Sequence, residues 1–226
     1  MADPTPPGLA AGSDPFRVDP ATLPAWRDVE RDALGCTRCT LAEHRTKVVF
    51  GTGPTDAELL LLGTAPGRQE DVLGQPFQGA AGNVVTNSLA QAGIPRDDVY
   101  ITNLVKCHPP DSRPPEPAEL EACAIHLFAQ LAHVRPRVIV TFGELPTWVL
   151  LRRRVPIDRV AGYRLDVFDG VTLVPTWDPI LAVKGNPTAM RSIGRDLATA
   201  KAVLDGRLSS GKDAVADAMA RRDGGS

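Results

Sequence analysis

Four cysteines are the residues of this 226-residue chain whose type and spacing most directly suggest chemistry. Cys36 and Cys39 form a C-x2-C pair flanked by loop-forming residues, and Cys107 and Cys123 follow much later in the chain. Two thiolates on one turn can bind one centre, with a third and a fourth brought in by the fold. The spacing alone allows zinc as well as iron and sulfur. Cys123 also falls on an apolar helical stripe, so a buried core thiol is an alternative for this residue.

A second candidate site is the glycine- and proline-rich loop GTAPGRQEDVLGQPFQGAAG at residues 63–82, which follows a run of leucines. It matches neither a P-loop nor a dinucleotide-binding fingerprint. Its glycines at 63, 67, 74, 79 and 82 let backbone N–H groups approach a ligand where a side chain would collide. Asp71 in this loop could equally be an exposed carboxylate, and we assign it no chemical role.

The elements that must position these residues alternate between strand and helix. Such alternation predicts an α/β fold with a mainly parallel central sheet sandwiched between helices. Ligands of such sheets lie beyond the carboxyl ends of the strands, so loop 63–82 and the segments after Thr102 and Thr176 are expected to converge. We expect strands at 58–63, 99–104 and 137–143, a hairpin at 163–168 and 171–176, and helices at 24–34, 82–92, 116–134, 144–151 and from 186 onward.

Three ordered segments resemble the iron-sulfur uracil-DNA glycosylases known as family 4. They are GTAPGRQEDVLGQPFQGAAG at 63–82, VYITNLVKCHPP at 99–110 and VPTWDP at 174–179. The resemblance covers roughly residues 36–204 and includes all four cysteines. It implies a DNA-repair enzyme that flips uracil out of DNA and hydrolyses the N-glycosidic bond, which leaves an abasic site. It also implies a structural 4Fe-4S cluster with Cys36, Cys39, Cys107 and Cys123 as ligands.

The same resemblance assigns the binding of the flipped base to five residues. Phe77 matches the stacking position, where an aromatic ring must lie on the base, and a core phenylalanine is the alternative. Asn103 matches the position whose amide both donates to and accepts from the base edge, and a turn-forming asparagine is the alternative. Gly63, Ala65 and Gly67 belong to the loop that would form a backbone mould for the nucleotide.

Two positions depart from the family pattern at the catalytic centre. The family usually has Gly-Glu-Ala-Pro-Gly where this chain has Thr64 after Gly63, so a hydroxyl replaces a carboxylate that would position water. The family usually has His-Pro where this chain has Asp178 before Pro179, which removes a donor to the uracil oxygen that gathers charge. Losing one such donor costs about 100- to 1000-fold in rate, and a charged Asp178 would repel the leaving anion. A protonated Asp178 could instead donate, if burial raises its pKa.

These departures leave two functions open, while the presence of Phe77 and Asn103 argues against a third, a zinc or iron-sulfur scaffold with no base pocket. The first is a uracil-DNA glycosylase, with Thr64 and Asp178 at its catalytic centre and with a reduced rate or an altered base preference. The second is a catalytically weak or inactive module of the same fold that binds uracil-containing or damaged DNA.

Contact with DNA must come from a local patch, because the formal net charge of the chain is −2. The resemblance places an apolar wedge at Ile180 and Leu181, for which a buried turn is the alternative. We expect Lys184 and Arg191 to contact phosphates nearby. Further candidates, which could equally form a solvated face, are Arg152, Arg153, Arg154, Arg159, Arg164 and Arg195.

Composition predicts one globular domain over residues 25–206, since 43% of the chain is apolar and 23% is charged. Residues 1–24 are rich in proline and are expected to form a disordered lead, and residues 207–226 a loosely ordered tail. No apolar run approaches the roughly 20 residues that span a bilayer, and the N-terminus has no signal-peptide pattern. We therefore expect a cytoplasmic protein, and a monomer, whose partner is uracil-containing DNA.

Overall fold

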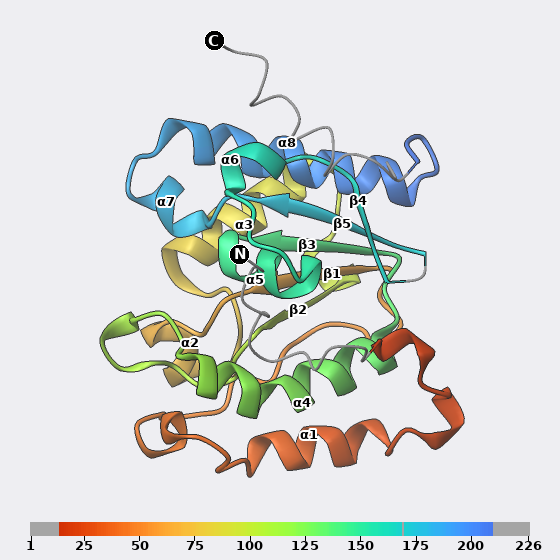
Figure 1. The fold of residues 1–226 in the computed structure, drawn as a ribbon. Coiled ribbons are helices and arrows are strands. Elements are labelled where there is room, and N and C mark those ends of the chain that lie inside the picture. The colour runs from red at the N-terminus through yellow and green to blue at the C-terminus, as the bar shows by residue number, and fades with distance from the viewer. Residues whose placement is uncertain (1–13, 169, 210–226) are drawn as a thin grey trace, which may run out of the picture.

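The computed structural model of this chain describes residues 14–168 and 170–209, and it confirms the α/β fold. Five strands of this part of the chain form one sheet in the order β2-β1-β3-β5-β4, with helices on both faces (Figure 1). Neighbouring strands are parallel except β4 with β5. The strands are β1 (Leu59–Gly63), β2 (Val99–Asn103), β3 (Val138–Phe142), β4 (Leu165–Val167) and β5 (Val171–Thr176).

The helices divide between the two faces of the sheet. α3, α7 and α8 pack against one another on one face, and α4, α5 and α6 cover the other, with α1 on the outer side of α4 (Figure 1). The helices are α1 (Trp26–Leu34), α2 (Arg68–Leu73), α3 (Gly79–Gln91), α4 (Pro117–Val134), α5 (Glu144–Leu151), α6 (Ile157–Val160), α7 (Pro179–Val183) and α8 (Pro187–Leu204). None of the helices in the described residues is long and apolar enough to cross a membrane.

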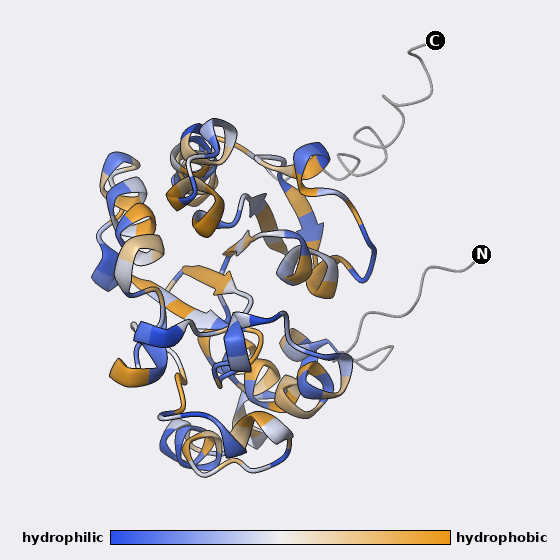
Figure 2. Ribbon diagram, turned by 90° about the vertical axis from the view of Figure 1, so that its left-hand side faces the viewer, coloured by the Kyte–Doolittle hydropathy of each residue, from blue (hydrophilic) through white to orange (hydrophobic). Residues whose placement is uncertain are grey.

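The leucine run of β1 shows why the central strands read as continuous apolar segments. Leu60 and Leu62 pack into the core under α4, whereas Leu59 and Leu61 pack into the core under α3 and α8. Because successive side chains of a strand point to opposite faces, a sheet covered on both sides buries every residue of its central strands. The helices carry both blue and orange residues in Figure 2, as expected when one side of a helix meets a core and the other meets water.

The expected elements appear with shifted ends, and three short helices were not expected. The helix that we expected at residues 82–92 begins earlier, at Gly79, and the helix expected from residue 24 begins at Trp26. α2 lies inside the glycine-rich loop and ends at Leu73, and its C-cap Gly74 has a left-handed backbone with a φ of 78°. α7 begins directly after Asp178, whose side chain caps it, and α6 has only four residues.

Residues 14–24 lie within the lead that we expected to be disordered, yet they form two 3-10 turns, Pro15–Arg17 and Pro20–Thr22. The ring centre of Phe16 lies 5.2 Å from that of Phe168, and the Phe16 carbonyl accepts a 2.8 Å hydrogen bond from Arg135. These contacts attach the segment to the domain. The expectations for residues 1–13 and 210–226 lie outside the described residues.

The outer side of β2 is bordered by a short segment that precedes β1 in the chain. Thr52 forms an antiparallel bridge with Ile101, with backbone hydrogen bonds of 3.0 Å and 2.8 Å in the two directions. This segment therefore satisfies backbone groups of β2 that would otherwise face solvent.

Candidate active site and cysteine cavity

An open cavity of about 670 Å³ lies at the carboxyl ends of β1, β2 and β3. Its walls come from the loop after β1, the end of β2, the first residues of α5 and the segment after β5. The three segments that the sequence predicted to converge therefore do so. The volume lies in the range of small-molecule sites, and the position is the one that open parallel sheets use for ligands.

Phe77 and Asn103, the two predicted base readers, meet at Gly63, the last residue of β1. A methyl group at Gly63 would lie 2.3 Å from Asn103 Oδ1 and 2.8 Å from Phe77 Cζ. Both side chains also line the cavity. An aromatic ring and a primary amide that lie side by side can stack on, and hydrogen-bond to, the same flat heterocycle.

The backbone of Phe77 is held in an unusual conformation. Its φ of 50° lies in the left-handed region, which costs a residue with a side chain about 1–3 kcal/mol. The Phe77 carbonyl accepts a 3.1 Å hydrogen bond from Arg96, and a methyl group at Gly82 would lie 1.9 Å from the same oxygen. The residue is 9% exposed, and the centre of its ring lies 5.1 Å from that of Phe142. Phe77 therefore packs on the core and also lines the cavity. Its environment fits the core phenylalanine in part and the base-stacking residue in part.

Asp178 lies at the start of α7 and also lines the cavity. Its Oδ1 atom accepts a 2.9 Å hydrogen bond from the Ile180 N–H, which makes it the N-cap of the helix. Its Oδ2 atom lies 3.7 Å from the place where a methyl group at Gly143 would be. Burial raises the pKa of Asp178 above its ordinary value, although the Ile180 N–H and Lys184 act in the opposite direction. The direction of this shift favours the neutral carboxyl, which is the form that can donate.

Thr64, Ala65 and Gly67 line the same cavity, as the resemblance implies. Thr64 is half-buried, and its carbonyl accepts a 3.3 Å hydrogen bond from the Val105 N–H. Sequence reasoning missed Glu70, which also lines the cavity and whose Oε1 accepts a 3.2 Å hydrogen bond from the Gln78 N–H. The available signal was its place in the same loop, three residues after Gly67.

Asp71 is buried rather than exposed, which corrects the interpretation of this residue as a surface carboxylate. Each of its two oxygens accepts a 2.9 Å hydrogen bond from the Thr46 N–H. The carboxylate thereby joins α2 to the segment that follows the C-x2-C pair. Its role is to hold two loops together.

The four cysteines line one small cavity behind the active-site loop. Hydrogen-bond donors point at three of the sulfurs. Arg45 lies 3.4 Å from Cys107 Sγ, Arg38 lies 3.8 Å from Cys36 Sγ, and the Lys106 backbone N lies 3.3 Å from Cys123 Sγ. Such donors suit thiolate ligands.

The thiols share this cavity without forming a site for a single ion. In residues 14–168 and 170–209, no three His, Cys, Asp or Glu side chains are grouped so that they could hold one metal ion. Cys123 is buried, as its alternative interpretation required, and burial raises its pKa to about 11. His126, about one helical turn further along α4, also lines the cavity, and its buried Nε2 atom has no hydrogen-bond partner among the residues that the structure describes. Sequence reasoning placed neither His126 nor the adjacent Lys106 at this site.

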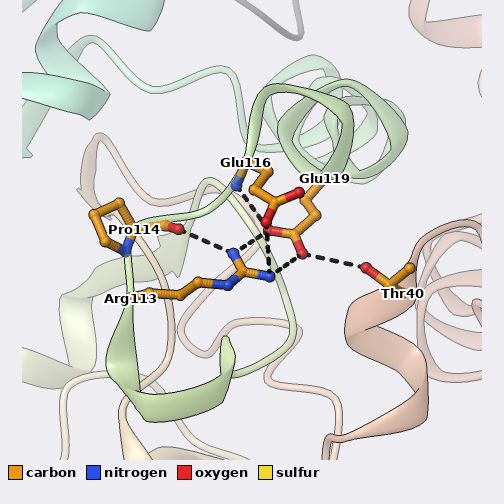
Figure 3. A network of polar contacts seen from close by, with 5 residues as sticks. All are labelled: Thr40, Arg113, Pro114, Glu116 and Glu119. Atoms are coloured by element: carbon orange, nitrogen blue, oxygen red, sulfur yellow. Dashed lines mark hydrogen bonds and ion pairs between the residues drawn. The ribbon is translucent and has the colours of Figure 1, made fainter.

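A network around Glu119 connects the cysteine segment to the wall of the active-site cavity (Figure 3). Arg113, which lines that cavity, donates to the two carboxylate oxygens of Glu119 at 2.6 Å and 2.8 Å. Thr40, the residue after Cys39, donates to Glu119 at 3.3 Å, and Cys123 lies one turn further along α4. The hydrogen bond from Arg113 keeps the pKa of Glu119 below its ordinary value. Glu119 also closes a capping box with Glu116 at the start of α4, which the sequence did not signal because the N-cap is a glutamate.

The predicted DNA-contacting residues lie on the α7–α8 side of the cavity. Ile180 is 41% exposed, so the buried-turn alternative does not hold for it, and both Ile180 and Leu181 line the cavity. Lys184 directly follows α7, and Arg191 lies in α8; both side chains are exposed. The arginines at 152–154 follow α5, and the guanidinium of Arg154 lies 4.3 Å from the ring centre of Trp148.

Comparison with known proteins identifies the family. The sequence profile of the uracil DNA glycosylase superfamily matches residues 50–197. The type-4 uracil-DNA glycosylase of Thermotoga maritima is 39% identical over 159 residues, which cover 70% of this chain and 83% of that protein. That of Saccharolobus solfataricus is 36% identical over 180 residues, covering 76% and 83%. That of Archaeoglobus fulgidus is 47% identical over 117 residues, covering 52% of this chain and 59% of that protein. This chain therefore belongs to the uracil DNA glycosylase superfamily and is similar to its type-4 members.

Proposed function

We propose that this chain removes uracil from DNA by hydrolysing the N-glycosidic bond, which leaves an abasic site. The observation that carries the proposal is the meeting of the Phe77 ring and the Asn103 amide at Gly63, inside an open cavity. The similarity to type-4 uracil-DNA glycosylases supports it. The substrate must leave the base stack to reach such a site, as the substrates of base-modifying enzymes do.

In the proposed complex, Phe77 stacks on one face of the flipped base and Asn103 pairs with its edge. The loop residues Gly63, Ala65 and Gly67 approach the nucleotide through their backbone. Because an amide both donates and accepts, Asn103 can match a uracil carbonyl and the adjacent N–H together. These contacts select and hold the base before any bond breaks.

Breakage of the bond leaves negative charge on uracil, and in this proposal Asp178 stabilises that charge by donating a hydrogen bond. In its neutral form the carboxyl donates from Oδ2, while Oδ1 remains bound to the Ile180 N–H. The raised pKa of Asp178 favours this neutral form. Thr64, in the place of the family's glutamate, offers a hydroxyl that orients the attacking water.

We also propose that Cys36, Cys39, Cys107 and Cys123 hold a 4Fe-4S cluster. A single tetrahedral zinc needs four sulfurs at about 2.3 Å from one point. In a cluster each thiolate binds its own iron, so the sulfurs stand further apart. The four thiols line one cavity, as a cluster held by four thiolates requires. When bound, the cluster supplies a cross-link between the 36–39 turn, the segment after β2 and α4.

The proposed partner is uracil-containing DNA, approached from the α7–α8 side. Ile180 and Leu181 enter the duplex as an apolar wedge, and Lys184 and Arg191 contact phosphates. One chain supplies every proposed residue of this site, so a monomer suffices for the proposed reaction. We place this reaction in the cytoplasm.

A second candidate function is a module that binds uracil-containing or damaged DNA without cutting it. The N-cap of α7 favours this alternative. The carboxyl of Asp178, which stands where the family has a histidine, already accepts a hydrogen bond from the Ile180 N–H and is thereby engaged in the helix cap. Retention of Phe77 and Asn103 is compatible with both functions. Formation of abasic sites separates them.

The test combines excision with binding on matched oligonucleotides that carry uracil or thymine. Alkali cleavage of abasic sites is expected for the uracil strand alone. Asn103→Ala should remove the preference for uracil and leave the salt-dependent affinity for the DNA backbone largely intact. Asn87→Ala, which changes an exposed amide on α3, is the matched control. Equal wild-type affinity for both strands together with no abasic product would refute uracil excision and specific binding of uracil-containing DNA, whereas preferential binding without product would support the second function.

A further inference from the structure

Lys106 is completely enclosed between the active-site cavity and the cysteine cavity. The residue is 1% exposed, although lysines are seldom buried in proteins. Its Nζ atom donates to Thr102 Oγ1 at 2.7 Å, to the Asn103 backbone oxygen at 2.6 Å and to Gln130 Oε1 at 2.6 Å. An ammonium group has three N–H donors, so these three oxygens satisfy all of them. A buried lysine with this arrangement is held in one place.

Gln130 is fixed by contacts of its own. Its Nε2 atom donates to the Phe50 carbonyl at 2.7 Å and to the Tyr100 hydroxyl at 3.0 Å. Because the amide nitrogen has these two acceptors, its oxygen must face the Lys106 Nζ atom. The long α4 helix thus provides a rigid anchor for the lysine.

The Asn103 peptide is held from two sides. Its carbonyl oxygen accepts from Lys106, while the next two amides, Leu104 N–H and Val105 N–H, donate to the carbonyls of Gly63 and Thr64 at 2.9 Å and 3.3 Å. β2 ends at Asn103, and beyond it the bonds of the Leu104 and Val105 amides to the loop after β1 hold only the donor side of the chain. Lys106 holds the acceptor side, at the carbonyl of the residue whose side chain reaches Gly63.

We infer that Lys106 is a positioning residue for base recognition, because its Nζ atom ties the Asn103 carbonyl to Thr102 and Gln130 and so holds the Asn103 amide toward the cavity. A binding group must be held within about 0.5 Å and 10–20° of its productive geometry, which requires such supporting contacts. The identity of the base rests on the proposed function, whereas the clamp on the Asn103 peptide does not.

The first experiment measures the clamp without any DNA. Lys106→Met keeps the length of the side chain and removes its donors, and Lys201→Met, at a surface ion pair with Asp205, is the matched control. Amide hydrogen exchange at Leu104 and Val105 should become about tenfold faster in Lys106→Met, with Val140 in β3 unchanged. Unchanged exchange at Leu104 and Val105 would overturn the inference, whether or not the protein excises uracil.

The second experiment asks whether Lys106 acts through Asn103. The ratio of affinities for uracil and thymine strands should fall about tenfold in Lys106→Met, and Lys106→Met should have no further effect in an Asn103→Ala background. Effects that multiply in the double variant would show that Lys106 acts independently of Asn103. Absence of any uracil preference in the wild type would count against the proposed function. The exchange measurement would still show whether Lys106 holds the Asn103 peptide in place.

Thermal melting and iron content distinguish a loss of positioning in Lys106→Met from a general loss of structure. Lys106→Met should retain the wild-type iron content and a cooperative melting transition. If Lys106→Met does not fold, Thr102→Val removes one of the three acceptors and takes its place in the same cycle. A smaller loss of uracil preference that again disappears with Asn103→Ala supports the inference, and a loss that persists contradicts it.

Discussion

Asp178→Asn is expected to change how uracil excision depends on pH. Asp178 caps α7 through Oδ1, and asparagine is an equally good N-cap, so its amide oxygen can accept the same Ile180 N–H. The substitution therefore removes a titrating carboxyl while it preserves the helix start. Any change in the pH profile then reports the charge at position 178.

The magnitude follows from the position of the carboxyl. Two unit charges 4 Å apart interact by about 4 kcal/mol at an effective dielectric constant of 20. Asp178 is half-buried, and the Ile180 N–H and Lys184 stabilise its charge, so we expect about 1.4 kcal/mol, or about tenfold in rate.

The sign follows from the direction of the pKa shift. Burial raises the pKa of Asp178 above its ordinary 3.8, so the neutral donor persists to a higher pH than for a solvated aspartate. The wild-type rate should fall as the pH rises through this raised pKa, because the ionised carboxyl repels the leaving uracil. Asp178→Asn should keep its rate across that interval, so the ratio of the two rates should grow with pH and then level off.

Single-turnover excision of uracil from an oligonucleotide, measured over a pH series, is the assay. Asp178→His should exceed Asp178→Asn, because histidine supplies a donor and, when protonated, a positive charge. Loss of the cap in Asp178→His is expected to cost about 1 kcal/mol of stability, which thermal melting checks. Parallel pH profiles for wild type and Asp178→Asn would refute the reasoning, since they would show that Asp178 does not titrate during the reaction.

Three further predictions concern the pocket and the cysteines. Gly63→Ala should abolish the preference for uracil in strand-competition assays, because the new methyl group would lie 2.3 Å from Asn103 Oδ1; an unchanged preference would show that the base binds elsewhere. The purified protein should be brown with absorption near about 400 nm, and Cys36→Ala should lower both iron content and melting temperature. A colourless protein with stoichiometric zinc would contradict that prediction. Thr64→Glu should raise the single-turnover rate by about tenfold, and the double variant with Asp178→His should raise it further. If neither variant gains in rate, residues other than Thr64 and Asp178 limit the reaction.

The sheet and the convergence of Phe77 and Asn103 at one cavity could be predicted from the sequence because their signals are local. The leucines of β1 form one continuous apolar run, and Phe77 and Asn103 lie in motifs that resemble a known family. Lys106 could not be placed in this way, because its burial depends on Gln130, 24 residues away in the chain. Asp71 likewise pairs with a backbone amide 25 residues earlier. From sequence alone a charged residue in a loop is predicted to be exposed, because the partners that allow its burial are distant in the chain.

The edges of the sheet limit how this domain can associate with other chains. Thr52 already occupies backbone groups of β2 at one edge, and β4 at the other edge has only three residues. An extended peptide that adds to a sheet needs a longer row of free N–H and C=O groups, and so does the edge-to-edge pairing that starts aggregation. Both edges of the sheet are therefore poor sites for strand addition, and the helices and loops offer the better surfaces for protein partners and neighbouring copies.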